Sequence, residues 1–214
     1  MSEAAMPPQA VVFDFGGVLF RWKPLELVQT VLPQHARDEG EAQALVSAVF
    51  QSFAPGSDWS EFDRGALTWD AVATRIAGRT GLPQADVEAL MSAIPPHLAP
   101  MPSSVAWLQA LAETGVPLYF LSNMPLPYAD YLRREHTFLG HFLDGVFSCH
   151  VGQIKPNADI FETTAQHFGL DPARTVFIDD SLHNVNTARS LGWRAVQFVD
   201  AAQCQAELAD RRWL

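Results

Sequence analysis

The sequence predicts an α/β protein: a parallel sheet with helices on both faces and an all-helical segment inserted after the first strand. Two observations support this fold class. Between about residues 100 and 200, short runs of Val, Ile, Leu and Phe alternate with stretches whose apolar residues recur at helical spacing. Such alternation is typical of parallel strands joined by right-handed helical crossovers. Residues 21–98, by contrast, contain no convincing buried strand.

The first expected strand is Ala10–Phe13, four apolar residues that lead into Asp14 and then a pair of glycines, Gly16 and Gly17. An unbroken apolar run of this kind is typical of a strand buried on both faces of a parallel sheet. Asp14 then lies at the carboxyl end of the strand, where ligands bind in open α/β sheets. The glycines permit positive φ, so that backbone amides after Asp14 are expected to face an anion.

The next eighty residues predict helices. Apolar residues fall on one helical face over 45–53, and further helices are expected over 72–76 and 87–94, the former capped by Thr68 or Asp70. Four prolines within residues 95–102 predict a connector. A helix capped by Ser103 or Ser104 follows. The remaining strands are expected at 116–121, 145–149, 175–178 and 195–199, with helices at 160–168 and 184–191.

Composition excludes several functions. The 214 residues are long enough to bury a sizeable core, and 18% are charged, with a net charge of −10. Nucleic-acid binding requires clustered Lys and Arg, which are absent here. The two cysteines, Cys149 and Cys204, have no metal or redox spacing. No leader-like or membrane-spanning apolar run occurs, so we expect a cytoplasmic protein without nucleic-acid or membrane partners.

Polar residues follow each of the first four expected strands: Asp14, Ser122–Asn123, Lys155 and Asp179–Asp180. The carboxyl ends of parallel strands share one edge, so these side chains are expected to meet in one crevice. Taken singly, Ser122–Asn123 also fits a helix cap and Lys155 a solvated loop lysine. Adjacent buried carboxylates such as Asp179–Asp180, however, require a cation unless they are well hydrated.

Together these motifs, Phe13–Val18, Leu121–Asn123, Lys155–Pro156 and Phe177–Ser181, resemble the haloacid dehalogenase-like hydrolase superfamily, including its sugar-1-phosphate phosphatase branch. The resemblance covers residues 9–20 and about 100–200. It implies a Rossmann-like core domain over residues 1–20 and 99–214 and a helical cap domain over residues 21–98.

The resemblance also implies roles for individual residues. Asp14 would attack phosphorus and form an aspartyl-phosphate, Ser122 would bind a phosphoryl oxygen, and Lys155 would neutralise phosphate and Asp14. Backbone groups of Gly16, Gly17 and Asn123 would contact the substrate. The resemblance implies a Mg²⁺ site formed by Asp14, the Gly16 carbonyl, Asp179 and Asp180, without deciding which of the last two binds directly.

The sequence departs from the superfamily at Gly16, where the usual motif has a second aspartate that acts as general acid and base. Two explanations stay open. Either the substrate has an easy leaving group, such as an anomeric sugar, acyl or aryl phosphate, or a cap residue supplies the proton. Asp63 is the candidate, although an acidic residue on a helical insertion is more often simply solvated.

We therefore expect a Mg²⁺-dependent phosphatase that acts on a small phosphorylated metabolite, with sugar phosphates among the candidates. The alternatives are a 2-haloacid dehalogenase, which uses no metal, and a non-catalytic protein that binds a phosphorylated ligand. The sequence leaves the oligomeric state open.

Overall fold

The computed structural model describes residues 8–214, so residues 1–7 of the expected core domain lie outside the description. The described chain forms one five-stranded sheet in the order β3-β2-β1-β4-β5, and every neighbouring pair is parallel. The strands are β1 Ala10–Phe13, β2 Leu118–Ser122, β3 Asp144–Phe147, β4 Thr175–Asp179 and β5 Arg194–Gln197. The predicted α/β fold is confirmed.

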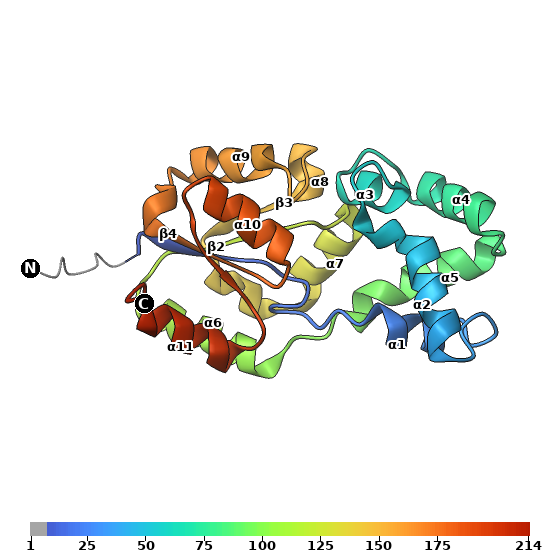
Figure 1. The fold of residues 1–214 in the computed structure, drawn as a ribbon, viewed down its shortest axis with the longest axis horizontal. Helices are drawn as coiled ribbons and strands as arrows, with labels where there is room; N and C mark the ends of the chain where they lie inside the picture. Colours follow the sequence, from blue (N-terminus) through green and yellow to red (C-terminus); the bar gives the residue numbers. More distant parts are fainter. Residues whose placement is uncertain (1–7) are drawn as a thin grey trace, which may run out of the picture.

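Helices cover both faces of the sheet. Figure 1 shows α9 and α10 on one face and α6 and α11 on the other. Side chains of β1 alternate between these layers: Val11 and Phe13 join one core cluster, whereas Ala10 and Val12 join a second cluster under α9 and α10. The helices outside the insertion are α6 Pro102–Glu113, α7 Leu126–Glu135, α8 Ser148–Val151, α9 Ala158–Phe168, α10 Leu182–Ser190 and α11 Ala201–Asp210.

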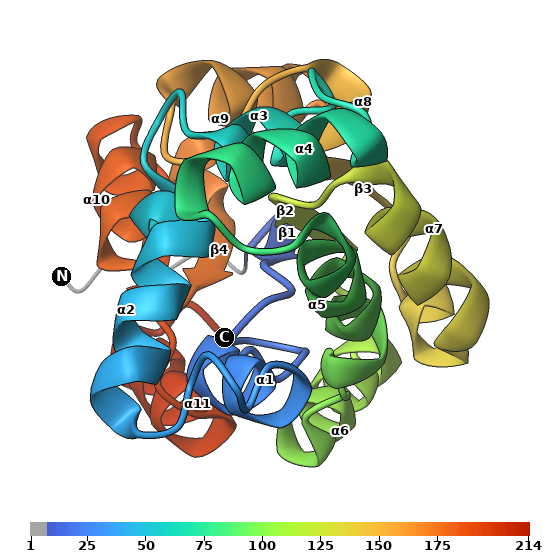
Figure 2. The same cartoon turned by 90° about the vertical axis from the view of Figure 1, so that its right-hand side faces the viewer.

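The helical insertion, residues 21–98, lies beyond the carboxyl ends of the strands (Figures 1 and 2). Its two connections to the core run side by side, since the Arg21 amide donates to the Ala99 carbonyl and the Met101 amide to the Leu19 carbonyl. Thr68 caps one of its helices, accepting a hydrogen bond from the Ala71 amide. The helices are α1 Pro24–Val31, α2 Glu39–Phe50, α3 Asp58–Asp63, α4 Trp69–Thr80 and α5 Gln84–His97.

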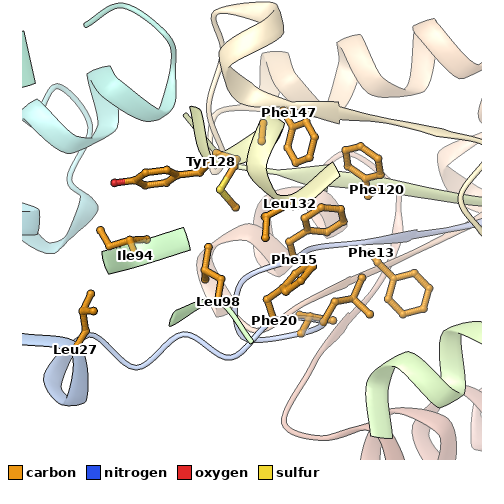
Figure 3. Packing of buried hydrophobic residues seen from close by; sticks show 14 of the residues in the cluster. Phe13, Phe15, Phe20, Leu27, Ile94, Leu98, Phe120, Tyr128, Leu132 and Phe147 are labelled. Atoms are coloured by element: carbon orange, nitrogen blue, oxygen red, sulfur yellow. The ribbon is translucent and has the colours of Figure 1, made fainter. Parts of the chain in front are cut away.

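The prediction that Pro95 begins a connector is wrong, because α5 continues through Pro95 and Pro96 to His97. Pro95 has no amide to donate to the carbonyl four residues earlier, that of Met91. The Tyr128 hydroxyl donates to this carbonyl instead, at 2.9 Å. Tyr128 lies on α7 in the core, so this bond also ties the insertion to the core. Figure 3 shows the Tyr128 ring beside Ile94, between the insertion and the core phenylalanines.

Several predicted boundaries were also wrong. Ser103 and Ser104 lie inside the first turn of α6, which begins with Pro102 after Met101 at the N-cap. Proline fits the first helical turn, where its missing amide would have no partner. Ser148 and Cys149 belong to α8 rather than to the third strand. No helix within residues 8–214 is long and apolar enough to span a bilayer.

Candidate active site

The four polar motifs converge at the carboxyl edge of the sheet, as predicted. Asp14 follows β1, Ser122 ends β2 and Asp179 ends β4. A cavity of about 630 Å³ opens above this edge, between the core and the helical insertion. Residues of all four motifs line it: Asp14, Gly16, Ser122, Asn123, Lys155, Pro156, Asp180 and Ser181. The fold thus brings together residues that are distant in the sequence.

Lys155 lies at the centre of the site and is buried, so it is not a solvated loop lysine. Its Nζ is 2.8 Å from Asp14 Oδ1 and 2.6 Å from Asp179 Oδ2, and it donates to the Leu121 carbonyl at 2.9 Å. Burial by itself disfavours the charged ammonium, but the two carboxylates outweigh this effect and raise the pKa of Lys155. The ammonium therefore holds two acidic motifs together with all three of its protons engaged.

Both carboxylate oxygens of Asp179 accept hydrogen bonds from other groups of the protein. Its Oδ1 accepts hydrogen bonds from the Ser181 amide at 2.8 Å and from Asn184 Nδ2 at 2.9 Å. Its Oδ2 accepts from Lys155 and from Asn184. Sequence reasoning missed Asn184, which reaches back from the first turn of α10. The signal was a side-chain amide five residues after a buried carboxylate.

Asp180 differs from Asp179, because it is exposed and lines the cavity. Asp14, Asp179 and Asp180 each place a carboxylate oxygen within 4.8 Å of the others. Although Asp180 reaches solvent through the cavity, the surrounding protein still removes part of the hydration of its carboxylate, and this desolvation, with repulsion from Asp179, raises the pKa of Asp180 to about 6. Burial raises the pKa of Asp14 to about 7, although Lys155 counteracts it. Clustered carboxylates that destabilise one another's charge are consistent with a metal site.

Gly17 has a structural role that differs from the predicted one. Its amide donates to the Phe20 carbonyl at 2.8 Å, so this amide is not available to an anion. Its φ is +74°, and an added Cβ would lie 2.3 Å from Asp180 Oδ2. Only glycine therefore allows the turn after β1 to pass this close to Asp180. Gly16, by contrast, lines the cavity as expected.

Asn123 holds the backbone of Lys155. Its Nδ2 donates to the Lys155 carbonyl at 2.9 Å, and its Oδ1 accepts from the Lys155 amide at 2.8 Å. The helix-cap interpretation of Ser122–Asn123 is wrong, because the N-cap of α7 is Pro125. The helix begins at Leu126, after both polar residues, and Ser122 and Asn123 line the cavity instead.

Asp63, the candidate from the insertion, lines the same cavity at the end of α3 and is only 7% exposed. Within the described chain, its carboxyl group has no hydrogen bond or ion pair, and burial raises its pKa well above the usual value. The Ser148 hydroxyl, which sequence reasoning missed, donates to the Asp63 carbonyl at 2.5 Å and accepts from the Met124 amide at 2.8 Å. Ser148 therefore links the backbone of Asp63, in the insertion, to the backbone of Met124, in the core.

The model of a protein family described as haloacid dehalogenase-like hydrolases matches residues 8–192 of this chain. The chain belongs to this family. It is 28% identical over 201 residues to a sesquiterpene phosphatase of Aspergillus oryzae, with 94% of both chains covered. It is also 31% identical over 97 residues to enolase-phosphatase E1 of Xylella fastidiosa, a match that covers 44% of this chain and 41% of the relative. With phosphatases among its relatives, this family member is a hydrolase.

Solved structures of the same family share the fold. A family enzyme from Bacteroides thetaiotaomicron, in complex with magnesium and inorganic phosphate, superposes with a TM-score of 0.70 at 19% identity, covering 91% of this chain and 98% of the other. The L-2-haloacid dehalogenase of Xanthobacter autotrophicus superposes with a TM-score of 0.67 at 18% identity, covering 94% and 82%. At these identities the likeness shows the fold alone.

Proposed function

We propose that the protein is a Mg²⁺-dependent phosphatase that hydrolyses a small phosphate monoester through an aspartyl-phosphate on Asp14, with the helical insertion acting as a cap over the site. The observation that carries this proposal is the arrangement of Asp14, Lys155, Asp179 and Asp180 at one sheet edge. It combines a nucleophile, a fixed positive charge and a set of hard oxygen ligands.

The carboxylate cluster fits a small divalent cation. The engagement of Asp179 by Lys155, Ser181 and Asn184 favours Asp14 and Asp180 as the direct ligands, together with the Gly16 carbonyl that the family pattern implies. Asp179 then acts through Lys155 or through a metal-bound water. When bound, the ion would neutralise charge on the phosphoryl oxygens and on the carboxylates.

The reaction proceeds in two displacements. In the first, an Asp14 carboxylate oxygen forms a bond to phosphorus while the bond from phosphorus to the ester oxygen breaks and its electron pair leaves with the alcohol. Ser122 donates a hydrogen bond to a phosphoryl oxygen. In the second, water attacks phosphorus, the bond to Asp14 breaks, and inorganic phosphate leaves.

Asp63 supplies the proton that the Gly16 position no longer provides. Burial raises the pKa of this carboxyl group well above its usual value and so favours the protonated form, which can protonate the leaving alcohol oxygen. The resulting carboxylate then accepts a proton from the attacking water, which returns Asp63 to its starting state. With an acid in place, the substrate does not need an unusually easy leaving group.

The dehalogenase alternative is less well supported. It needs no metal, yet the chain keeps two adjacent carboxylates, one of which faces the cavity without an ion-pair partner in the described residues. A purely ligand-binding protein has Gly16 as its only support, since the other motif residues are all in place.

The test measures phosphate release from a panel of phosphate monoesters with Mg²⁺, before and after EDTA, for wild type and Asp14→Asn. We expect turnover that EDTA abolishes and Mg²⁺ restores, and that Asp14→Asn lowers by several orders of magnitude. An Asp70→Asn variant, which removes an exposed carboxylate on α4, controls for charge. Equal turnover by wild type and Asp14→Asn would remove Asp14 from the mechanism. Chloride release from 2-chloropropionate in EDTA would favour the dehalogenase.

A further inference from the structure

The phosphatases among the relatives do not fix the organic part of the substrate of this chain, but the cavity walls bear on it directly. Above the motif residues, the cavity is bounded by an apolar wall that we define as Trp22, Phe53, Trp59, Ile94, Leu98 and Tyr128. We propose that this wall binds an apolar hydrocarbon group, so that the substrate is the monophosphate of a hydrophobic alcohol rather than of a sugar or nucleoside. This inference rests on the proposed phosphatase function.

The aromatic members of the apolar wall form a connected set. The Trp22 and Phe53 rings are 6.4 Å apart, and the Trp59 and Tyr128 rings are 6.5 Å apart. Phe50 joins the two pairs from behind, with its ring 5.4 Å from Phe53 and 4.7 Å from Trp59. The rings are therefore held in place by packing and form a preformed surface for a hydrocarbon.

Phe53 marks the wall as a binding surface. It is 41% exposed, and of the large hydrophobic side chains exposed in residues 8–214 it alone lines the cavity. An apolar ligand in the cavity would cover this ring and remove its contact with water. Ile94, another member of the apolar wall, lies beside Tyr128 in Figure 3.

The insertion offers few partners for a sugar. Apart from the indole N–H groups of Trp22 and Trp59, its polar side chains on the cavity are Ser52, Ser60 and Asp63. Ser60 already donates its proton to the Ser57 carbonyl, and across the cavity the Tyr128 hydroxyl donates to Met91.

Charge and size narrow the class further. Lys155 is the only lysine or arginine among the cavity-lining residues, and it already pairs with Asp14 and Asp179, so a second phosphate would find no further lysine or arginine there. The cavity of about 630 Å³ holds on the order of twenty water-sized groups. After the five atoms of a phosphoryl group, room for on the order of fifteen carbons remains.

The test compares kcat/KM, by phosphate release with Mg²⁺, for butyl phosphate, octyl phosphate, glucose 1-phosphate and a nucleoside monophosphate. Each buried methylene is worth about fourfold in binding, so octyl phosphate is expected to exceed butyl phosphate at least tenfold. The two polar esters are expected to fall below octyl phosphate. Phe53→Ser should lower the octyl-to-butyl ratio severalfold, whereas Leu143→Ser, which removes an exposed apolar side chain away from the cavity, should not.

A second readout needs no turnover. Octylphosphonate and butylphosphonate are titrated while the fluorescence of the cavity tryptophans is followed, and the octyl compound should bind more tightly in wild type than in Phe53→Ser. If polar esters match or exceed octyl phosphate, or if chain length changes neither turnover nor phosphonate affinity, the inference is wrong while the phosphatase function stands. If no ester releases phosphate but phosphonate affinity rises with chain length, the phosphatase function fails and the apolar site stands.

Discussion

Replacing Asp63 by Asn tests the assignment of the proton donor, because the change removes the acid while keeping nearly the same volume. General acid catalysis contributes about 10²–10⁴-fold when the leaving oxygen is strongly basic. We therefore expect kcat for an alkyl phosphate to fall within this range. For 4-nitrophenyl phosphate, whose leaving group needs no proton, the loss should be below about tenfold.

The assay is a plot of log kcat against leaving-group pKa for a series of aryl and alkyl phosphates. Wild type should give a shallow slope and Asp63→Asn a steep one. Glu61→Gln is the matched control, since Glu61 lies on the same helix but outside the cavity and pairs with Arg64. An equal loss for all esters, with unchanged slope, would show that Asp63 only shapes the site and would refute the proton-donor role.

Stability provides an independent check of the same carboxyl group. Its pKa in the folded protein lies well above the usual value of 3.8. Between these two pKa values the folded chain keeps a proton that the unfolded chain releases, so the free energy of unfolding falls by about 1.4 kcal/mol per pH unit as pH rises. Asp63→Asn abolishes this contribution. Urea unfolding at a series of pH values should show the variant gaining stability relative to wild type with rising pH, and a constant difference would contradict a buried protonated Asp63.

Three further substitutions test positions that the structure singles out. Gly17→Ala should lower kcat at least tenfold and raise the Mg²⁺ concentration needed for half-maximal activity, because the new Cβ displaces Asp180. The control is Gly78→Ala on α4, where the new Cβ meets no other atom, and it should leave both quantities unchanged. Ser148→Ala should lower both kcat and Tm, because the two backbone groups that the hydroxyl links lose their partner; unchanged kinetics would show that this link does not position the acid. Tyr128→Phe should lower the free energy of unfolding by about 1–3 kcal/mol in urea titrations, because the Met91 carbonyl loses the hydroxyl that donates to it. A wild-type value would mean that this carbonyl finds another donor.

Local sequence patterns were enough to predict the parallel sheet and the convergence of the motifs. Unbroken apolar strands such as Ala10–Phe13 are specified locally, and parallel strand ends share an edge for topological reasons, so the grouping of Asp14, Ser122, Lys155 and Asp180 followed without coordinates. Local rules did not predict that α5 continues past Pro95, because the compensating donor, the Tyr128 hydroxyl, lies thirty-three residues after Pro95 in the sequence.

The roles of individual residues within the site depend on tertiary contacts. Asp179 and Asp180 are adjacent and chemically identical in the sequence, and they differ only because Lys155, Ser181 and Asn184 surround one of them while the other faces the cavity. Asp63 likewise fits a solvated helix residue in the sequence, whereas in the fold Ser148 binds its backbone carbonyl and burial raises the pKa of its carboxyl group. Burial and long-range hydrogen bonds set the chemistry of a carboxyl group, and both depend on contacts that no local pattern encodes.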